Sequence, residues 1–140
     1  MKPIKILVIE DDDVDFLQIK KSFKEANVLN EIIRAVDGIE AKEKLENGEV
    51  PVGSIALLDL NMPRMNGSEF LEWLRSENSP KKFRKMPVIV LTTSNDPSDI
   101  NDVYSNWASG YIVKPLDNGE FTKVATITDK YWSLCEIPRG

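Results

Sequence analysis

Five short apolar runs, each followed by a segment of helical character, constrain the fold of this chain more than any other feature. The run at residues 4–9 is compact and apolar, which predicts a buried strand. The segment after it carries apolar residues at the spacing of an amphipathic helix, namely Phe16, Ile19, Phe23 and Ala26. Asp12 or Asp13 can cap the start of that helix.

The same alternation repeats to the end of the chain. Further strands are expected at residues 32–36, 55–58, 87–91 and 111–113, and further helices at 39–47, around Phe70, Leu71 and Leu74, at 97–107, and after Asp117 or Asn118. The last helix would carry Phe121, Val124, Thr128 and Tyr131. A polar loop at residues 76–85, before the fourth strand, is longer than most connections in compact domains.

Repeated strand–helix units predict an α/β fold whose parallel sheet is covered by helices on both faces. Right-handed crossovers and the flavodoxin-like arrangement give a doubly wound (βα)5 sheet with strand order 2-1-3-4-5. The 140 residues are the length of one domain. We therefore expect residues 1–140 to form one domain, with a short C-terminal extension of the last helix at about 131–140.

Composition excludes several classes of function. The formal charge of −5 argues against a nucleic-acid footprint, and the basic cluster at residues 81–85 is interpreted as a solvated loop. The absence of histidine excludes histidine catalysis and most zinc sites. Cys135 is the single cysteine, so an internal disulfide is impossible, and a cytoplasmic location is expected. No signal peptide and no membrane span are predicted.

Polar residues with complementary chemistry follow four of the expected strands. Glu10 and Asp11 end the first, Asp59 the third, Thr92 the fourth and Lys114 the fifth. The carboxyl ends of parallel strands meet at one edge of the sheet, where such folds place their sites. Clustered carboxylates repel one another unless a cation lies among them, and oxygen ligands of this kind suit Mg²⁺.

This constellation predicts a site for a phosphoryl group. A carboxylate can form an acyl phosphate, so Asp59 would be the nucleophile. Asp11 and Asp59 would hold Mg²⁺, with the backbone carbonyl of Asn61 as a further ligand, while Lys114 and the Thr92 hydroxyl would each contact a phosphoryl oxygen. Taken singly, each residue has an ordinary structural explanation, such as a helix cap or a surface lysine; their joint placement favours the site.

Four stretches, residues 6–12, 57–67, 87–94 and 110–115, resemble in order the motifs of the receiver domain of two-component response regulators. The resemblance covers essentially residues 4–130. It implies that Asp59 is the phosphoacceptor, and that Glu10 and Asp11 are the acidic pair that binds Mg²⁺, Asp11 directly and Glu10 through water.

The resemblance also implies a switch. Thr92 matches the switch hydroxyl, Tyr111 the switch aromatic residue and Lys114 the phosphate-binding lysine. The peptide bond between Lys114 and Pro115 is cis in relatives. The implied partners are a sensor histidine kinase or phosphotransfer protein and a downstream target. Such a protein catalyses its own phosphorylation and dephosphorylation and is not classed as an enzyme.

Two positions depart from the usual receiver pattern. Glu10 stands where many relatives carry Asp, which is a common variant. Trp107 stands where relatives usually carry a small residue, and core packing is expected for it because a buried aromatic ring needs no partner.

The loop at residues 76–85 and the tail at 131–138 resemble a narrower group. Its members are single-domain receivers that serve bacterial phytochrome-type histidine kinases. The apolar tail suggests a homodimer through the fourth helix, the fifth helix and the tail, although the tail could equally fold back onto its own domain.

Two other classes remain as alternatives. A Mg-dependent aspartyl-nucleophile phosphatase or phosphotransferase would also use Asp, Thr and Lys, but it requires a carboxylate two positions after the nucleophile, where this chain has Asn61. A flavodoxin-like cofactor binder requires a phosphate-cradling loop after the first strand, and the acidic residues there would repel phosphate.

Overall fold

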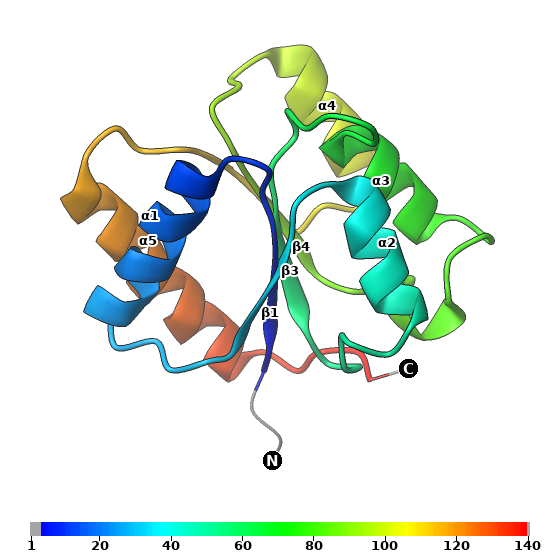
Figure 1. The fold of residues 1–140 in the computed structure, drawn as a ribbon, viewed down its shortest axis with the longest axis horizontal. Helices are drawn as coiled ribbons and strands as arrows, with labels where there is room; N and C mark the ends of the chain where they lie inside the picture. Colours follow the sequence, from blue (N-terminus) through cyan, green and yellow to red (C-terminus); the bar gives the residue numbers. More distant parts are fainter. Residues whose placement is uncertain (1–3, 140) are drawn as a thin grey trace.

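A computed structural model describes residues 4–139 of the protein. Its five strands form one parallel sheet in the order β2-β1-β3-β4-β5 (Figure 1). In chain order the elements are β1 (Ile6–Ile9), α1 (Asp13–Glu25), β2 (Ile32–Ala35), α2 (Gly38–Glu46), β3 (Ile55–Leu58), α3 (Gly67–Arg75), the 3-10 helix η1 (Lys81–Phe83), β4 (Val88–Thr92), α4 (Pro97–Ser105), β5 (Gly110–Val113) and α5 (Asn118–Leu134). The predicted fold class and strand order are confirmed.

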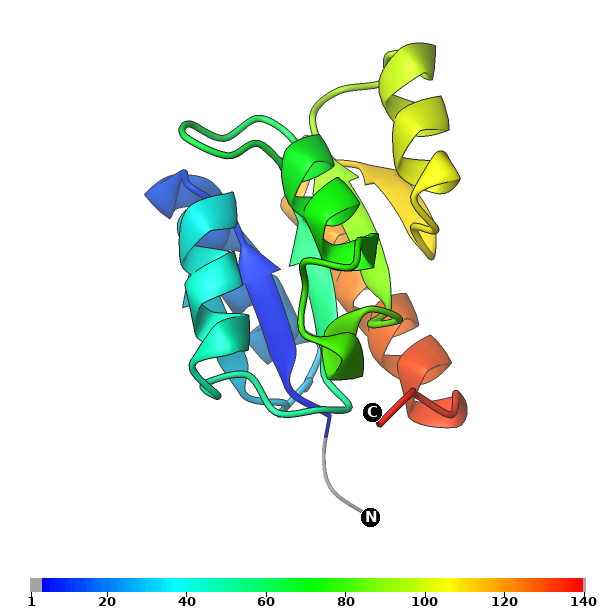
Figure 2. The same cartoon turned by 90° about the vertical axis from the view of Figure 1, so that its right-hand side faces the viewer.

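The helices cover both faces of the sheet. α1 and α5 lie together on one face, and α2, α3 and α4 lie on the other (Figures 1 and 2). Alternate residues of the strands enter one of two apolar clusters: Leu7 and Ile9 pack toward α2 and α3, and Ile6 and Val8 toward α1 and α5. Every residue of β1, β3 and β4 is buried, as expected for central strands with both faces covered.

Each of the five α-helices begins at a side-chain cap. Asp12, rather than Asp13, caps α1 by accepting a hydrogen bond from the amide of Asp15. Asp37, Asp96 and Asp117 serve α2, α4 and α5 in the same way. These caps satisfy amides that the helical ladder leaves without partners, which explains why polar residues mark the junctions between strands and helices.

The loop at residues 76–85 is more ordered than a solvated connection. It contains η1, and Phe83 packs into the apolar cluster beneath α2, α3 and α4. Arg75 joins the end of this loop to α3 by donating hydrogen bonds to the carbonyls of Arg84 and Met86 at 2.9 and 2.7 Å. The interpretation of the basic cluster as solvated therefore holds for the exposed lysines and is wrong for Phe83.

The C-terminal segment divides between the core and the surface. α5 ends at Leu134, and the rings and side chains of Trp132 and Ile137 are buried against β1, β3 and α1. Tyr131 and Leu134, by contrast, are exposed, Leu134 to 88%. Part of the tail folds back, and part of it remains an apolar surface. No helix in residues 4–139 is long and apolar enough to span a membrane.

Trp107 is not in the core. Its side chain is 77% exposed, so the expected core packing is wrong. Trp107 lies two residues after the last residue of α4, and its backbone adopts the left-handed conformation with φ of 61°. The amide of Trp107 donates to Tyr104 O and that of Ala108 to Val103 O, the arrangement of a Schellman motif, in which glycine is the favoured residue at this position. A bulky side chain here is strained and directed outward.

Replacing Trp107 with Gly is expected to raise the free energy of unfolding by about 1 kcal/mol, because glycine adopts positive φ without strain. The corresponding rise in melting temperature is roughly 3–5 °C for a domain of this size. Thermal and urea unfolding measure it. Trp107→Ala is the matched control, because alanine removes the ring but keeps the strain; equal stability of the two variants would contradict this explanation.

Candidate functional site

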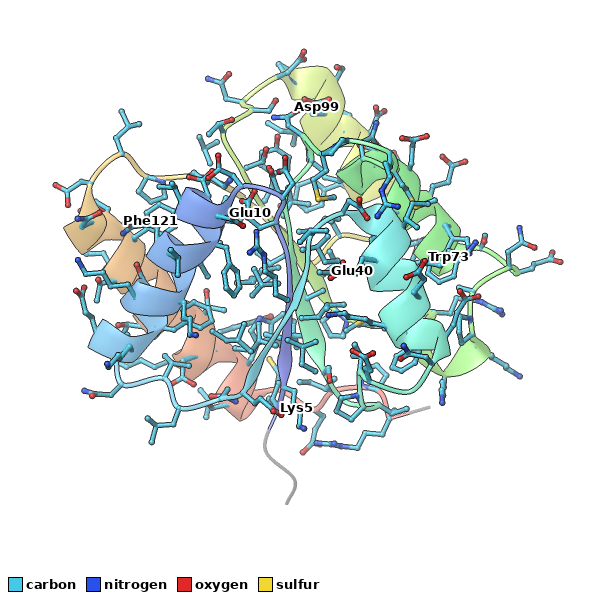
Figure 3. All side chains as sticks on the ribbon, viewed as in Figure 1. Lys5, Glu10, Glu40, Trp73, Asp99 and Phe121 are labelled. Atoms are coloured by element: carbon cyan, nitrogen blue, oxygen red, sulfur yellow. The ribbon has the colours of Figure 1, made fainter. Side chains whose placement is uncertain are left out.

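The polar residues that end the strands converge at one edge of the sheet. Figure 3 shows Glu10 at the carboxyl end of β1. Asp59 follows β3 directly, and the parallel pairing of β1 with β3 places it beside Glu10, with the Asp59 amide donating to Ile9 O. Glu10, Asp11 and Asp59 each offer a carboxylate oxygen, and these oxygens lie within 4.8 Å of one another. Glu10 and Asp59 are buried, and Asp11 is exposed.

Lys114 supplies the positive charge of this cluster. Its ammonium lies 2.5 Å from Glu10 Oε1, 2.9 Å from Asp15 Oδ2 and 3.8 Å from Asp59 Oδ2. The Lys114 amide also donates to Thr92 O at 2.7 Å, which fixes the start of the loop after β5. The Lys114–Pro115 bond is trans, so the cis bond implied by the resemblance is not found. The lysine nevertheless points inward.

Two residues of the site were not assigned from the sequence. Asp15, in the first turn of α1, accepts a hydrogen bond from Lys114. Arg34 of β2 donates to the carbonyls of Glu10 and Asp11 and pairs with Asp13 at 2.8 Å, so it holds the acidic loop after β1 in place. Asp15 belongs to the acidic run after β1, which consists of residues 10–13 and Asp15, whereas nothing around Arg34 in the sequence indicated its long-range contact.

Thr92, the last residue of β4, is fully buried at the same edge. Its hydroxyl oxygen has no hydrogen-bond partner within the described part of the chain. A buried hydroxyl without a partner is costly, and a bound group that accepts its hydrogen bond would remove the cost. The side chain is therefore a free donor at the end of a central strand.

Tyr111 of β5 links this edge to α4. Its ring is partly buried against the apolar cluster on the α2–α4 face, and its hydroxyl donates to Ser94 O at 2.8 Å. The Ser94 hydroxyl in turn donates to Asp99 of α4 at 2.6 Å, and Asp99 is labelled in Figure 3. The aromatic ring, the β4–α4 loop and α4 thus form one connected unit.

The loop after Asp59 passes close to the site. Gly67, at the start of α3, donates its amide to Leu60 O, and a Cβ added there would lie 2.3 Å from Asp59 O. Only glycine permits this approach. At its tip the loop is fastened to α2 by an ion pair between Arg64 and Asp37 at 2.6 Å. Asn61 lies in this loop, two residues after Asp59, and is exposed.

Burial and neighbouring charges shift the pKa values of Glu10 and Lys114. Burial raises the pKa of Glu10 from 4.5 to about 8, and the charge of Asp59 acts in the same direction, against the hydrogen bond from Lys114. Burial alone would lower the pKa of Lys114, but its hydrogen bonds to Glu10 and Asp15 outweigh this and raise it. A second cation would relieve the repulsion that remains.

The donor set fits such a cation. Three converging carboxylates provide only hard oxygen ligands, which suit divalent ions such as Mg²⁺ and Mn²⁺ and not a soft metal. The exposed position of Asp11 leaves the cluster open to an ion from solvent.

The motifs and the geometry agree with the comparison against known families. Residues 6–126 match the response regulator receiver domain. The chain belongs to this family. Receiver domains bind divalent metal ions, are phosphorylated on an aspartate and interact with histidine kinases in two-component signalling. Those of the CheY type are signalling proteins.

Individual relatives match over most of their length. The chemotaxis protein CheY1 of Helicobacter pylori is 30% identical over 81% of this chain and 86% of its own. The phosphorylated cyanobacterial phytochrome response regulator RcpA is 27% identical, with a TM-score of 0.85 over 98% of this chain and 99% of that one. The Mn²⁺-bound form of Rcp1, from Synechocystis sp., is 26% identical, with a TM-score of 0.83 over 97% and 99%. The resemblance to phytochrome-associated receivers is confirmed.

The raised pKa of Glu10 gives a testable dependence of stability on pH. Between pH 4.5 and about 8 the folded protein binds more protons at Glu10 than the unfolded chain does. The free energy of unfolding of the metal-free protein should therefore fall as the pH rises through this window. Urea unfolding at several pH values, with a chelator present, measures it.

Glu10→Gln is the matched variant, because it keeps the shape of the side chain and removes its titration. The difference in stability between the wild type and this variant should shift in favour of the variant as the pH rises. Parallel profiles for the two proteins would show that Glu10 titrates normally.

Proposed function

We propose that this protein is a response regulator that accepts a phosphoryl group on Asp59 from the phosphohistidine of a sensor histidine kinase or phosphotransfer protein. The observation that carries the proposal is the position of Asp59 close to both Lys114, 3.8 Å away, and the carboxylates of Glu10 and Asp11. Asp59 is buried at the edge where β1 and β3 end, and it shares this edge with an ammonium group and two further carboxylates.

In the transfer, an oxygen of the Asp59 carboxylate attacks phosphorus. A new P–O bond forms, the bond between phosphorus and the imidazole nitrogen of the donor breaks, and its electron pair returns to the imidazole, which takes a proton from solvent. The product on Asp59 is an acyl phosphate, and its hydrolysis returns inorganic phosphate. Lys114 neutralises one phosphoryl oxygen, and the free hydroxyl of Thr92 donates to another.

We assign the metal as Mg²⁺. Asp11 and Asp59 would hold it directly, Glu10 through water, and the carbonyl of Asn61 would complete the protein ligands. When bound, the ion supplies positive charge that offsets the carboxylates and the transferred phosphoryl group. The three carboxylates that lie within reach of one another support this assignment.

The rival proposal is an aspartyl-nucleophile phosphatase or phosphotransferase. Such an enzyme needs an acid–base group to serve the leaving group, and the side chain two positions after Asp59 is the amide of Asn61. We therefore propose that the chain catalyses only its own phosphorylation and dephosphorylation.

We propose that phosphorylation changes the structure of the surface formed by α4, β5 and α5, and that a downstream protein recognises this change. On phosphorylation the Thr92 hydroxyl turns to the phosphoryl group, and Tyr111 fills the space beside it. The bonds from Tyr111 to Ser94 and from Ser94 to Asp99 carry this change to α4. Phosphorylation would shift a pre-existing equilibrium between two arrangements of this unit.

Incubation with acetyl phosphate and Mg²⁺ tests the acceptor. Intact-mass analysis should show the addition of one phosphoryl group, dependent on Mg²⁺ and absent from Asp59→Asn. Asp12→Asn is the control, because Asp12 lies in the same acidic run but serves as a helix cap. Undiminished phosphorylation of Asp59→Asn would overturn the assignment.

We further propose that residues 1–140 are one receiver domain acting in the cytoplasm, and that it forms a two-fold homodimer through α4, α5 and the C-terminal extension. The exposed apolar side chains on this side support the dimer: Tyr104, Val113, Ile127, Tyr131 and Leu134. Clusters of this kind mark interfaces, and two-fold symmetry is the commonest arrangement of soluble homo-oligomers.

Sedimentation velocity at several concentrations, with and without beryllofluoride, tests the dimer. A dimer should be present at about 100 μM and strengthen with beryllofluoride, and Leu134→Ser should weaken it. Leu29→Ser is the matched control, because Leu29 is equally exposed but lies between α1 and β2. A monomer in both states at that concentration would contradict the proposal.

A further inference from the structure

A cavity lies at the opposite edge of the sheet from Asp59. It has a volume of about 360 Å³ and is lined by Arg75, Arg84, Lys85, Pro87, Trp107 and Ser109. Pro87 and Ser109 immediately precede β4 and β5, so the cavity opens at the amino ends of these strands. Three of its six lining residues are cationic, although the whole chain has a net charge of −5.

The guanidinium of Arg75 is partly buried and surrounded by neutral acceptors only. It donates to the backbone carbonyls of Asn106, Arg84, Met86 and Trp107 at 2.7–3.0 Å. Burial lowers the pKa of Arg75, and no carboxylate opposes this effect. Buried charges are usually paired, so the positive charge here lacks its common counterpart.

The other two cations are equally free of carboxylate partners. Within residues 4–139, no salt bridge joins Arg75, Arg84 or Lys85 to an acidic side chain. Arg84 donates from one nitrogen to the carbonyls of Glu77 and Ser79, but its Nε is buried and has no partner. The cavity is therefore lined by three cationic residues that have no carboxylate partner among the described residues.

Trp107 forms the aromatic part of the cavity wall. It is 77% exposed and occupies a position of positive φ where glycine would be more stable. The ring buries little apolar surface within the domain, so its packing does little to offset the backbone strain. Tryptophan and arginine are both enriched among the residues that contribute most of the binding energy at protein interfaces.

We propose that this cavity binds an acidic segment of a partner protein, with carboxylate side chains paired to Arg84 and Lys85 and an adjacent apolar side chain packed on Trp107. Charge complementarity favours an acidic ligand. A protein segment is favoured over a nucleic acid, because the net negative charge of the chain repels an extended polyanion. The volume is that of a small binding cavity and suits one or two side chains.

The cavity uses none of the residues at the carboxyl edge. Binding can therefore be measured with the unphosphorylated protein, and its outcome is independent of the assignment of Asp59. The probe is a blocked peptide of alternating Glu and Phe, and the control peptide replaces each Glu with Gln. Nuclear magnetic resonance follows the indole N–H of Trp107, identified by its loss in Trp107→Gly.

The Glu peptide should shift the Trp107 indole signal with a dissociation constant below about 1 mM, and the Gln peptide should not. Arg84→Gln and Trp107→Gly should each weaken binding about tenfold, the latter followed through backbone amides of residues 84 and 85. Lys81→Gln is the matched control, because Lys81 lies in the same loop outside the cavity, and it should leave the affinity within about twofold.

Three results would overturn the proposal. Absence of a shift with the Glu peptide at about 1 mM would exclude an acidic-peptide site. Equal weakening by Lys81→Gln and Arg84→Gln would indicate diffuse charge attraction. A shift with ATP but not with the Glu peptide would show that the cavity is a site for small anions.

Discussion

The buried ammonium group of Lys114 links the acidic residues at the carboxyl edge of the sheet. Lys114 lies within 4 Å of Glu10, Asp15 and Asp59, which come from three different segments of the chain. Glu10 and Asp59 are buried carboxylates with oxygens within 4.8 Å of each other, so they would repel one another without a positive charge beside them. One lysine offsets this repulsion only in part, because burial still raises the pKa of Glu10 to about 8. The cluster has more carboxylates than ammonium groups, and this excess of negative charge favours binding of a divalent cation.

The topology of the sheet brings these groups together. Parallel strands in the order β2-β1-β3-β4-β5 place the ends of β1, β3, β4 and β5 along one edge, so residues 104 positions apart in the sequence can share a hydrogen bond. Every residue of the central strands β1, β3 and β4 is buried, whereas β2 and β5 are partly exposed. Arg34 holds the loop after β1, and the close approach of Gly67 to Asp59 holds the loop after β3. Loops held on a buried frame are a common place for binding residues.

The fold and the composition of the site follow from local patterns. Apolar runs predicted the strands, and the polar residues that end four of these runs predicted which side chains would meet, because the position of a strand end depends on a few neighbouring residues. Contacts between distant segments were missed. Nothing near Arg34 indicated its bonds to the loop after β1, and nothing near Asp15 indicated Lys114 as its partner. Trp107 was placed in the core on hydrophobicity alone, whereas the end of α4 turns it outward.

We propose above all that Lys114 and Thr92 bind the phosphoryl group on Asp59. In the free protein Lys114 bonds to Glu10 and Asp15, and the Thr92 hydroxyl has no partner among the described residues. A crystal structure of the complex with Mg²⁺ and beryllofluoride, which mimics the acyl phosphate, tests this directly. We expect the ammonium of Lys114 and the hydroxyl of Thr92 each to contact a fluoride of the group on Asp59, at about 3 Å. A complex in which Lys114 remains on Glu10 and Thr92 still lacks a partner would contradict it.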